Sequence, residues 1–328
     1  MKARAVRIRE PGDPSVLDIV EVDVRDPGPD EVAVAVAASA VNRADLLQRR
    51  GLYPPPEGFP PDLLGMEYAG TVATIGANVR SHKVGDRVMG IIGSAGMATR
   101  VVVPSLEAIP VPENLSLPEA AAIPEVWLTA YDALFVQAEL QNRESVLVHA
   151  VGSGVGTALL QLAREIADAT VIGTSRTADK IERAKPFGLT HGIVATDNQF
   201  ADHVRKVTPD GVNVIVDPVG AAYLEENVRS IALKGRIVLY GSLGGVSGEL
   251  PIAILMSRRA RIIGTVLRSR SPAEKAELAQ RFTLDALPLF AKKKLHPVIA
   301  DVMPMSRVRE AHERMERNET FGKLVLTW

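Results

Sequence analysis

The chain has no cysteine among its 328 residues. Disulfide bonds, thiolate nucleophiles and cysteine-based metal sites are therefore excluded. Neither sign of charge dominates, because 38 Lys and Arg are matched by 39 Asp and Glu, for a formal net charge of -1. The basic residues are scattered, and the short runs Arg258–Arg259 and Lys292–Lys294 are typical of solvated surfaces. We therefore do not expect a nucleic-acid partner.

Long apolar runs are also absent. The longest, Val32 to Val41, is too short to cross a bilayer, and its alternation of Val with Ala predicts a strand. The N-terminus alternates charged and apolar residues and lacks the apolar core of a signal peptide. We expect a cytoplasmic protein with no membrane partner.

The sequence does have ample apolar material, since 46% of its residues are hydrophobic, and its length suits about two domains. Residues 1 to about 121 show period-two patterns and frequent turn signals, which are typical of a mostly β domain. The strands expected in this part are Lys2–Arg9, Glu31–Ala38, Tyr68–Ile75 and Arg87–Ile92.

From about 122 to 267, short apolar strands alternate with helical patterns, which predicts right-handed βαβ units and a parallel sheet. The expected strands are Ser145–Ala150, Thr170–Thr174, Val212–Val216, Arg236–Tyr240 and Ile262–Val266, and the expected helices include Ala178–Phe187, capped by Gly188, and Ala221–Leu233. The last sixty residues predict helices Pro272–Phe290 and Ser306–Arg317 and a strand Lys323–Thr327. This tail is too short to fold alone.

The predicted fold class is therefore α/β, with a doubly wound parallel sheet and a second, mostly β domain. We assign residues 122–267 to the parallel-sheet domain, and residues 1–121, completed by 268–328, to the β domain.

A glycine-rich turn follows the first strand of the alternating region. Val146–Ala150 leads into Val151-Gly152-Ser153-Gly154-Val155-Gly156 and then a helix. Small residues let the backbone approach a pyrophosphate, and the free N–H groups of the helix start point at the anion. Val151 and Ser153 occupy the first two positions of the usual G-x-G-x-x-G, so an ordinary tight turn is the alternative. We predict dinucleotide binding by Gly152, Ser153, Gly154, Val155 and Gly156.

The end of the second strand bears on the choice of cofactor. This strand ends in Thr174, Ser175 and Arg176, and Ser175 is nineteen residues after Gly156. No carboxylate is present there to hold a ribose 2′-hydroxyl. A hydroxyl, Arg176 and Lys180 could instead bind a 2′-phosphate, which favours NADPH. The alternative is that Arg176 and Lys180 are solvated.

Several separated motifs share one order along the chain. They are Asn42–Pro56, Gly65–Gly70, Val84–Val88, Val148–Gly156, Leu239–Gly241 and Gly322–Leu326. In this order the whole chain resembles the medium-chain dehydrogenase/reductase superfamily. Within it, the motifs resemble the zeta-crystallin-like quinone oxidoreductases, and among these the tumour-suppressor-inducible quinone oxidoreductase branch.

The resemblance implies a GroES-like substrate domain and a Rossmann domain, with an active site in the cleft between them. It implies that Asn42 and Tyr53 line the acceptor side, and that Thr129 and Lys323 contact the cofactor. Tyr240 and Gly241, at a strand end, fall where doubly wound sheets bind ligands. A homodimer would join the sheets through Arg259–Leu267, with further pairing into a tetramer left open.

The zinc ligands of the alcohol dehydrogenases in this superfamily correspond by motif register to Asn42, Met66 and Glu125. Asn and Met are poor zinc ligands, and one Glu cannot hold the ion, so we predict no metal. Without a Lewis acid, an acceptor that takes hydride readily, such as a quinone or an activated alkene, suits the site best. We predict an NADPH:quinone oxidoreductase.

Other interpretations stay open. An NADPH-dependent enoyl or alkenal reductase would use the same hydride chemistry, with Tyr53 protonating carbon. A non-catalytic NADPH-binding structural protein is the alternative of another class. Asn42 suits the N-cap of the following helix, Tyr53 could plug its loop, and Gln48 is expected on a solvated helix face. No residue stands out as a general acid, and Ala195 replaces a tyrosine that the family often has near the adenosine phosphate, which weakens the preference for NADPH.

Overall fold

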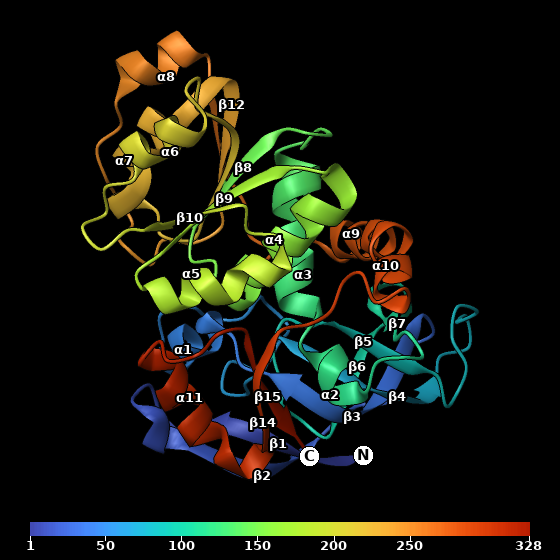
Figure 1. Ribbon diagram of the computed structural model, residues 1–328. Coiled ribbons are helices and arrows are strands. Elements are labelled where there is room, and N and C mark those ends of the chain that lie inside the picture. Colours follow the sequence, from blue (N-terminus) through green and yellow to red (C-terminus); the bar gives the residue numbers. More distant parts are fainter. The chain divides into compact units, whose positions relative to one another are not determined.

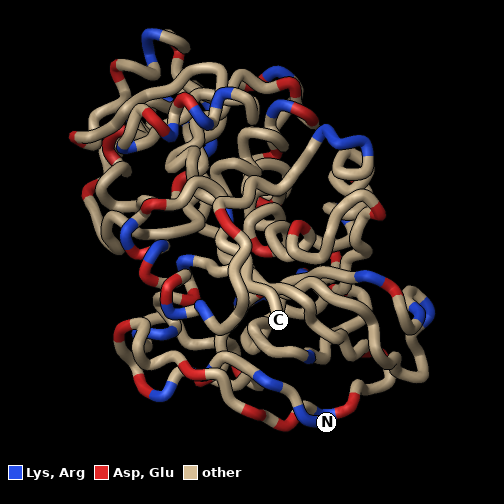
Figure 2. Tube along the Cα trace, turned by 60° about the horizontal axis from the view of Figure 1, so that its bottom comes forward, with Lys and Arg blue, Asp and Glu red and all other residues tan.

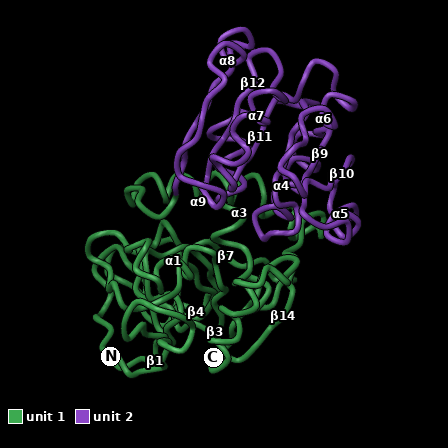
Figure 3. The backbone as a smooth tube through the Cα atoms, turned by 90° about the vertical axis from the view of Figure 1, so that its left-hand side faces the viewer, with its two compact units in different colours: residues 1–128, 267–328 green, residues 129–266 purple.

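The computed structural model describes all residues from Met1 to Trp328. The chain forms two compact units, shown in Figure 3. Unit 1 consists of Met1–Leu128 together with Leu267–Trp328, and unit 2 consists of Thr129–Val266. Lys and Arg are interspersed with Asp and Glu along the trace (Figure 2). No helix is long and apolar enough to cross a membrane.

Unit 2 is built on one six-stranded parallel sheet (Figure 1). Its strands are β8 (Ser145–Val148), β9 (Thr170–Ser175), β10 (His191–Val194), β11 (Val212–Asp217), β12 (Ile231–Leu239) and β13 (Arg261–Gly264). Its helices are α4 (Gly154–Ala167), α5 (Ala178–Ala184), α6 (Ala201–Val207), α7 (Leu224–Ser230) and α8 (Ile252–Arg258). The strand order β10-β9-β8-β11-β12-β13 is that of the doubly wound dinucleotide-binding fold, with its reversal between β8 and β11.

Local sequence explains where the helices of unit 2 begin and end. Ser153 caps α4, because its side chain accepts a hydrogen bond from the backbone N–H of Gly156. The predicted helix Ala178–Phe187 is present as α5 and one 3-10 turn, and Gly188 closes it with a φ of 112°. The predicted helix Ala221–Leu233 is too long, because Ile231 already pairs with Val212 as the start of β12 and is fully buried.

Unit 1 is organised around a seven-stranded sheet and a separate two-stranded sheet. The larger sheet has the order β14-β15-β3-β4-β5-β7, with β6 paired to β3. The strands are β1 (Lys2–Ile8) and β2 (Leu17–Asp23) in the small sheet, and β3 (Glu31–Ala40), β4 (Glu67–Ile75), β5 (Arg87–Ile91), β6 (Arg100–Pro104), β7 (Ile109–Pro110), β14 (Ile299–Pro304) and β15 (Lys323–Thr327) in the large one.

The helices of unit 1 are α1 (Arg43–Arg49), α2 (Leu117–Ala121), α9 (Pro272–Asp285), α10 (Leu287–Ala291) and α11 (Val308–Glu316). Helix α3 (Pro124–Tyr131) continues into unit 2 and into a π-helical turn, Asp132–Gln137. The predicted helix Pro272–Phe290 is divided at Ala286, because Pro288 has no N–H to continue the ladder.

The last strand joins the C-terminal segment to the sheet formed by the N-terminal part of the chain. β15 pairs antiparallel with β3, with Val325 opposite Ala40, so the C-terminal segment belongs to the sheet of unit 1. The predicted fold class, a parallel α/β sheet plus a mostly β domain, is confirmed.

Candidate active site

The glycine-rich turn lies where the strand order of unit 2 reverses. β8 ends at Val148, and the chain passes through Ala150, whose φ is 54°, before α4 begins at Gly154. The Ser153 hydroxyl accepts from Gly156 N at 2.9 Å. A Cβ on Gly156 would lie 2.4 Å from the Ala150 carbonyl oxygen, so only glycine lets α4 approach the strand this closely. This close approach of helix to strand is what the predicted pyrophosphate site requires.

A buried polar network connects the strands below this turn. His149 Nε2 lies 2.8 Å from Asn227 Oδ1, and His149 Nδ1 lies 2.8 Å from the Thr174 hydroxyl. The Asn227 amide in turn donates to Asp217 at 2.7 Å. Burial lowers the pKa of His149, so the imidazole is neutral and carries its proton on Nε2. The network links the carboxyl ends of β8, β9 and β11, and the Thr174 hydroxyl is engaged within it.

The end of β9 carries the predicted cofactor-selecting residues. Ser175 is buried and its hydroxyl accepts from Thr177 N at 3.3 Å, whereas Arg176 is exposed and Lys180 is partly buried. No carboxylate stands at this strand end, and Ala195, at the end of β10, is buried.

Three further predicted residues lie in unit 2. Tyr240 follows β12, its N–H donates to Asp217 O at 3.0 Å, and burial raises the pKa of its hydroxyl. Gly241 packs against Pro218, where a Cβ would lie 2.9 Å from the carbonyl oxygen. Thr129 lies in α3 and is partly buried.

Unit 1 contains a buried ion pair between Lys323 at the start of β15 and Glu67 at the start of β4. Lys323 Nζ donates to Glu67 Oε1 at 2.8 Å, to Asn42 Oδ1 at 2.6 Å and to Val41 O at 3.1 Å. The Lys323 side chain is 4% exposed and that of Glu67 is 0% exposed. These bonds use all three N–H groups of the ammonium.

Asn42 is held from both ends of its amide. Its Oδ1 accepts from Lys323, and its Nδ2 donates to Glu67 Oε1 at 2.8 Å and to Ala40 O at 3.3 Å. Asn42 stands at the N-cap position of α1, as expected, and the Asp45 carboxylate bonds its backbone N–H at 2.8 Å. Both hydrogens of the Asn42 side-chain amide are therefore donated to acceptors within unit 1.

The pair belongs to a larger cluster with more carboxyl groups than cations. The backbone N–H of Glu125 donates to Glu67 Oε2 at 2.8 Å. Burial raises the pKa of Asp45 to about 6, and burial together with the charge of Glu67 raises the pKa of Glu125 to about 8. Lys323 and Arg268 oppose both shifts through their positive charge. Glu125 therefore keeps its proton at neutral pH.

Tyr53 lies on the proline-rich loop that follows α1. The Arg268 guanidinium lies over its ring, 5.0 Å from the centroid, and donates to its carbonyl oxygen at 3.0 Å. Gln48 also joins this contact, because its Oε1 accepts from Arg268 at 2.5 Å. The expectation of a solvated Gln48 is wrong, since Gln48 is only 4% exposed.

Sequence reasoning missed Asp45, Glu67, Glu125 and Arg268 as members of a charged cluster. Glu67 offered one signal, because a charged residue inside the Gly65–Gly70 motif begins an otherwise apolar strand. Arg268 offered none, since it follows a strand end in a run of alternating Arg and Ser that looks solvated.

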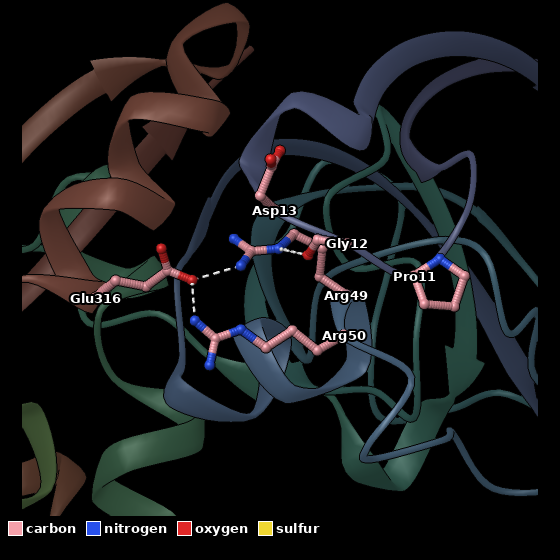
Figure 4. Close-up of a pocket in the computed structure, with 6 residues that line it drawn as sticks. All are labelled: Pro11, Gly12, Asp13, Arg49, Arg50 and Glu316. Atoms are coloured by element: carbon pink, nitrogen blue, oxygen red, sulfur yellow. Dashed lines mark hydrogen bonds and ion pairs between the residues drawn. The ribbon is translucent and has the colours of Figure 1, made fainter.

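A cavity of about 280 Å³ lies elsewhere in unit 1 (Figure 4). Its wall carries the guanidinium groups of Arg49 and Arg50, and both donate to the Glu316 carboxylate, Arg50 at 2.6 Å. Arg49 Nε also donates to Gly12 O at 2.9 Å. Asp13 adds a second carboxylate, so the charges of the wall are balanced. We assign no role to this cavity.

Comparison with known families matches both parts of the chain. Residues 28–113 match the alcohol dehydrogenase GroES-like domain, and residues 154–283 match the zinc-binding dehydrogenase domain. The chain is 33% identical over 316 residues to the synaptic vesicle membrane protein VAT-1 homolog of Rattus norvegicus, covering 92% of this chain and 77% of that protein. It is 32% identical over 314 residues to quinone oxidoreductase-like protein 2 of Rattus norvegicus, covering 95% and 89%.

Solved structures match over almost the whole chain. An NAD-dependent alcohol dehydrogenase gives a TM-score of 0.87 at 32% identity, with 99% of both chains covered. A quinone oxidoreductase of Pseudomonas syringae pv. Tomato DC3000 gives 0.86 at 28% identity, covering 99% of this chain and 100% of that chain. The CurK enoyl reductase gives 0.86 at 25% identity, with 99% of both chains covered.

The chain therefore belongs to the medium-chain dehydrogenase/reductase superfamily. It is an oxidoreductase of this family, whose members bind a nicotinamide cofactor, NAD or NADP. The motif resemblance is confirmed at the level of the superfamily.

Proposed function

We propose that this chain is an NADPH-dependent quinone oxidoreductase that transfers hydride to a quinone without zinc. The observation that carries the proposal is the Lys323 ammonium, which is bonded to Asn42 and to Glu67. By the motif resemblance, Asn42 corresponds to one zinc ligand of the alcohol dehydrogenases, and Glu67 follows Met66, which corresponds to another. The quinone oxidoreductase neighbours support the same acceptor class.

A catalytic zinc does not fit the residues of this site. Of the three corresponding positions, Asn42 is committed to Lys323 and Glu67, Met66 offers a buried thioether, and Glu125 keeps its proton. The Lys323 ammonium, which is hydrogen-bonded to Asn42 Oδ1 and Glu67 Oε1, would repel a zinc ion placed beside these oxygens. No group of three or more His, Asp or Glu side chains in residues 1–328 could hold a metal.

The nicotinamide cofactor fits the turn of unit 2, where Gly152, Ser153, Gly154, Val155 and Gly156 would receive the pyrophosphate. Bound there, NADPH supplies the hydride. Ser175, Arg176 and Lys180 would bind the 2′-phosphate, because β9 ends without the carboxylate that favours NAD. Thr174 positions His149 below the turn.

The nicotinamide end of the cofactor site would be lined by Tyr240, Gly241 and Thr129. Tyr53 offers a ring face to a planar acceptor, and Asn42 forms the polar wall beside it. Lys323, with all three N–H groups donated within unit 1, contributes positive charge rather than a hydrogen bond. The chain positions the acceptor and excludes water around it.

A second candidate is an NADPH-dependent reductase of activated alkenes, such as enals or enones. The CurK enoyl reductase, with a TM-score of 0.86, favours it. The hydride chemistry would be the same, and the difference lies in protonation of carbon by Tyr53. The Tyr53 phenol is protonated at neutral pH, and because burial raises its pKa further, it would be a weak proton donor.

We also propose a homodimer joined through Arg259–Leu267. β13 is the last strand of the sheet of unit 2 and leaves one edge unpaired. Large apolar side chains near it in the sequence are exposed, Met256 at 70% and Ile252 at 61%. Further pairing into a tetramer and a cytoplasmic location stay predictions.

The test is NADPH oxidation, followed by absorbance, with an ortho-quinone, a para-quinone and an enone, each repeated with NADH. The proposal expects quinone turnover that prefers NADPH. Turnover of the enone alone would select the alkene reductase. Tight NADPH binding without turnover of any acceptor would overturn both and favour a structural, cofactor-binding protein.

A further inference from the structure

The loop Gly51–Asp62 carries Tyr53 but has little backbone structure of its own. Five of its twelve residues are proline, which have no N–H to donate. Backbone hydrogen bonds attach its first two residues to the end of α1 and its last residue to β1, where Ile8 N donates to Asp62 O at 2.7 Å. Phe59 N to Pro56 O at 3.3 Å is a bond within the loop. Between its two anchored ends, the position of Tyr53 depends on side chains that reach the loop from outside.

Gln48, on α1, fastens the far end of the loop. Its Nε2 donates to Leu63 O at 2.9 Å and to Pro61 O at 3.1 Å. The same nitrogen lies 3.3 Å from the Ser94 hydroxyl. A buried amide thus ties the exit of the loop to the helix that precedes its entry.

Arg268 fastens the near end. One guanidinium nitrogen donates to Tyr53 O at 3.0 Å, a second donates to Gln48 Oε1 at 2.5 Å, and Nε donates to Gly93 O at 2.8 Å. Its charge lies over the Tyr53 ring, where it is attracted by the negative face. Arg268 is 5% exposed, so these contacts are shielded from solvent.

The segment that Arg268 bonds also supports the middle of the loop. A Cβ on Gly93 would lie 2.6 Å from the Phe59 ring, so the ring packs directly on the Gly93 backbone. Entry, middle and exit of the loop are therefore fixed to one hub formed by Gln48, Gly93 and Arg268. The bonds join residues as far apart as 220 positions in the sequence.

We infer that Arg268 and Gln48 are positioning residues that hold the Tyr53 ring in place and thereby determine how well a planar acceptor binds. The inference rests on the proposed function, because it assigns Tyr53 to the acceptor. With one ring face against Arg268, Tyr53 has only its other face for an acceptor ring. A loop free to move would present that face in many orientations and bind a flat acceptor weakly.

The test combines hydrogen–deuterium exchange with steady-state kinetics on the full chain. Arg268→Met keeps the aliphatic part of the side chain and removes the guanidinium group with its hydrogen bonds. Arg268→Lys keeps a positive charge without the guanidinium geometry, and Gln48→Met removes the amide that bonds the end of the loop. Arg281→Met is the matched control, since Arg281 is an exposed arginine on α9.

We expect the hydrogen-bonded backbone amides of Leu52 and Phe59 to exchange about tenfold faster or more in the three variants, and at the wild-type rate in the control. The KM for a quinone should rise at least about fivefold, while the Kd for NADPH changes less than about twofold. Arg268→Lys, which keeps the charge, guards against a variant that does not fold.

Two results would overturn the inference: loop exchange equal to that of the control, or acceleration spread over the whole chain in proportion to lost stability. Faster loop exchange in a protein that reduces no quinone would uphold the positioning role and sink the proposed function. Quinone turnover with unchanged loop exchange and unchanged KM would overturn the positioning role and leave the proposed function standing.

Discussion

The Lys323 ammonium is bonded to Val41, Asn42 and Glu67 and is almost completely buried. A buried charge is costly unless it is paired, so Lys323 and Glu67 depend on each other.

Removing either partner of this pair should destabilise the fold strongly. Glu67→Gln or Lys323→Met alone should lower the free energy of unfolding by about 3–5 kcal/mol, because each leaves one buried charge unpaired. The double variant should lose much less than the sum. Urea unfolding measures all three, and the exposed pair Arg307–Glu310 is the control, whose removal should leave the unfolding curve nearly unchanged. Additive losses would show that the two charges act independently.

Glu125 gives the fold a pH dependence of defined sign. Its pKa of about 8 lies above the ordinary value for Glu, so the folded chain retains a proton that the unfolded chain releases. This contribution to stability is complete below the ordinary pKa and is lost as pH rises through about 8. Glu125→Gln stays neutral, so its Tm should gain on that of the wild type as pH rises from about 5 to 9. Parallel Tm curves would mean that Glu125 ionises normally.

Ser175 tests the choice of cofactor. Ser175→Asp places a carboxylate at the end of β9, where it can hold a ribose 2′-hydroxyl and repels a 2′-phosphate. The ratio of kcat/KM for NADPH to that for NADH should fall at least about tenfold. Asp179→Asn, an exposed change on α5, should leave the ratio alone. An unchanged ratio in Ser175→Asp would remove this residue from the cofactor site.

At the scale of elements, the glycine-rich turn depends on close packing of α4 on β8. Gly156→Ala puts a Cβ 2.4 Å from Ala150 O, so the turn must shift, which should cost about 1–3 kcal/mol and weaken NADPH binding. Gly264→Ala is the control in the same unit, because a Cβ there meets nothing within 4 Å. Fluorescence titration with NADPH measures both. Equal affinities would contradict the role of the turn.

The sequence predicted elements best where the signal is local. The strand Lys323–Thr327 was predicted with its observed bounds, and Gly188 closes the helical segment after Ala178, because hydrophobic periodicity and a glycine cap act over a few residues. The helix predicted through Leu233 was wrong, because pairing of Ile231 with β11 overrides a helical pattern.

The site was predictable only in part for the same reason. Asn42, Tyr53 and the turn Gly152–Gly156 lie in recognisable motifs, so their candidacy could be read from the chain. The contacts of Arg268 with Gln48 and of Lys323 with Asn42 span 220 and 281 residues, and no periodicity records them. Which charged residues are buried together became visible only in the fold.

At the scale of the whole molecule, the open edge of β13 determines the proposed dimer. Thr265 N donates to Leu239 O at 2.9 Å, so alternate N–H groups of this strand point to β12 and that of Gly264 points to the open edge. Gly264→Pro removes this donor where nothing lies within 4 Å of a Cβ. It should shift the mass measured by light scattering toward the monomer, while Gly264→Ala stays dimeric. Equal masses would place the interface elsewhere.

We propose that this oxidoreductase reduces quinones with an ammonium–carboxylate–amide cluster in place of zinc. The most direct measurement is the metal content of one sample, determined together with its rate of NADPH-dependent quinone reduction before and after chelation. We predict that the rate is retained when zinc falls to a few hundredths of an ion per chain, and that added zinc does not raise it. A rate that falls with the zinc content and returns on adding zinc would overturn this proposal.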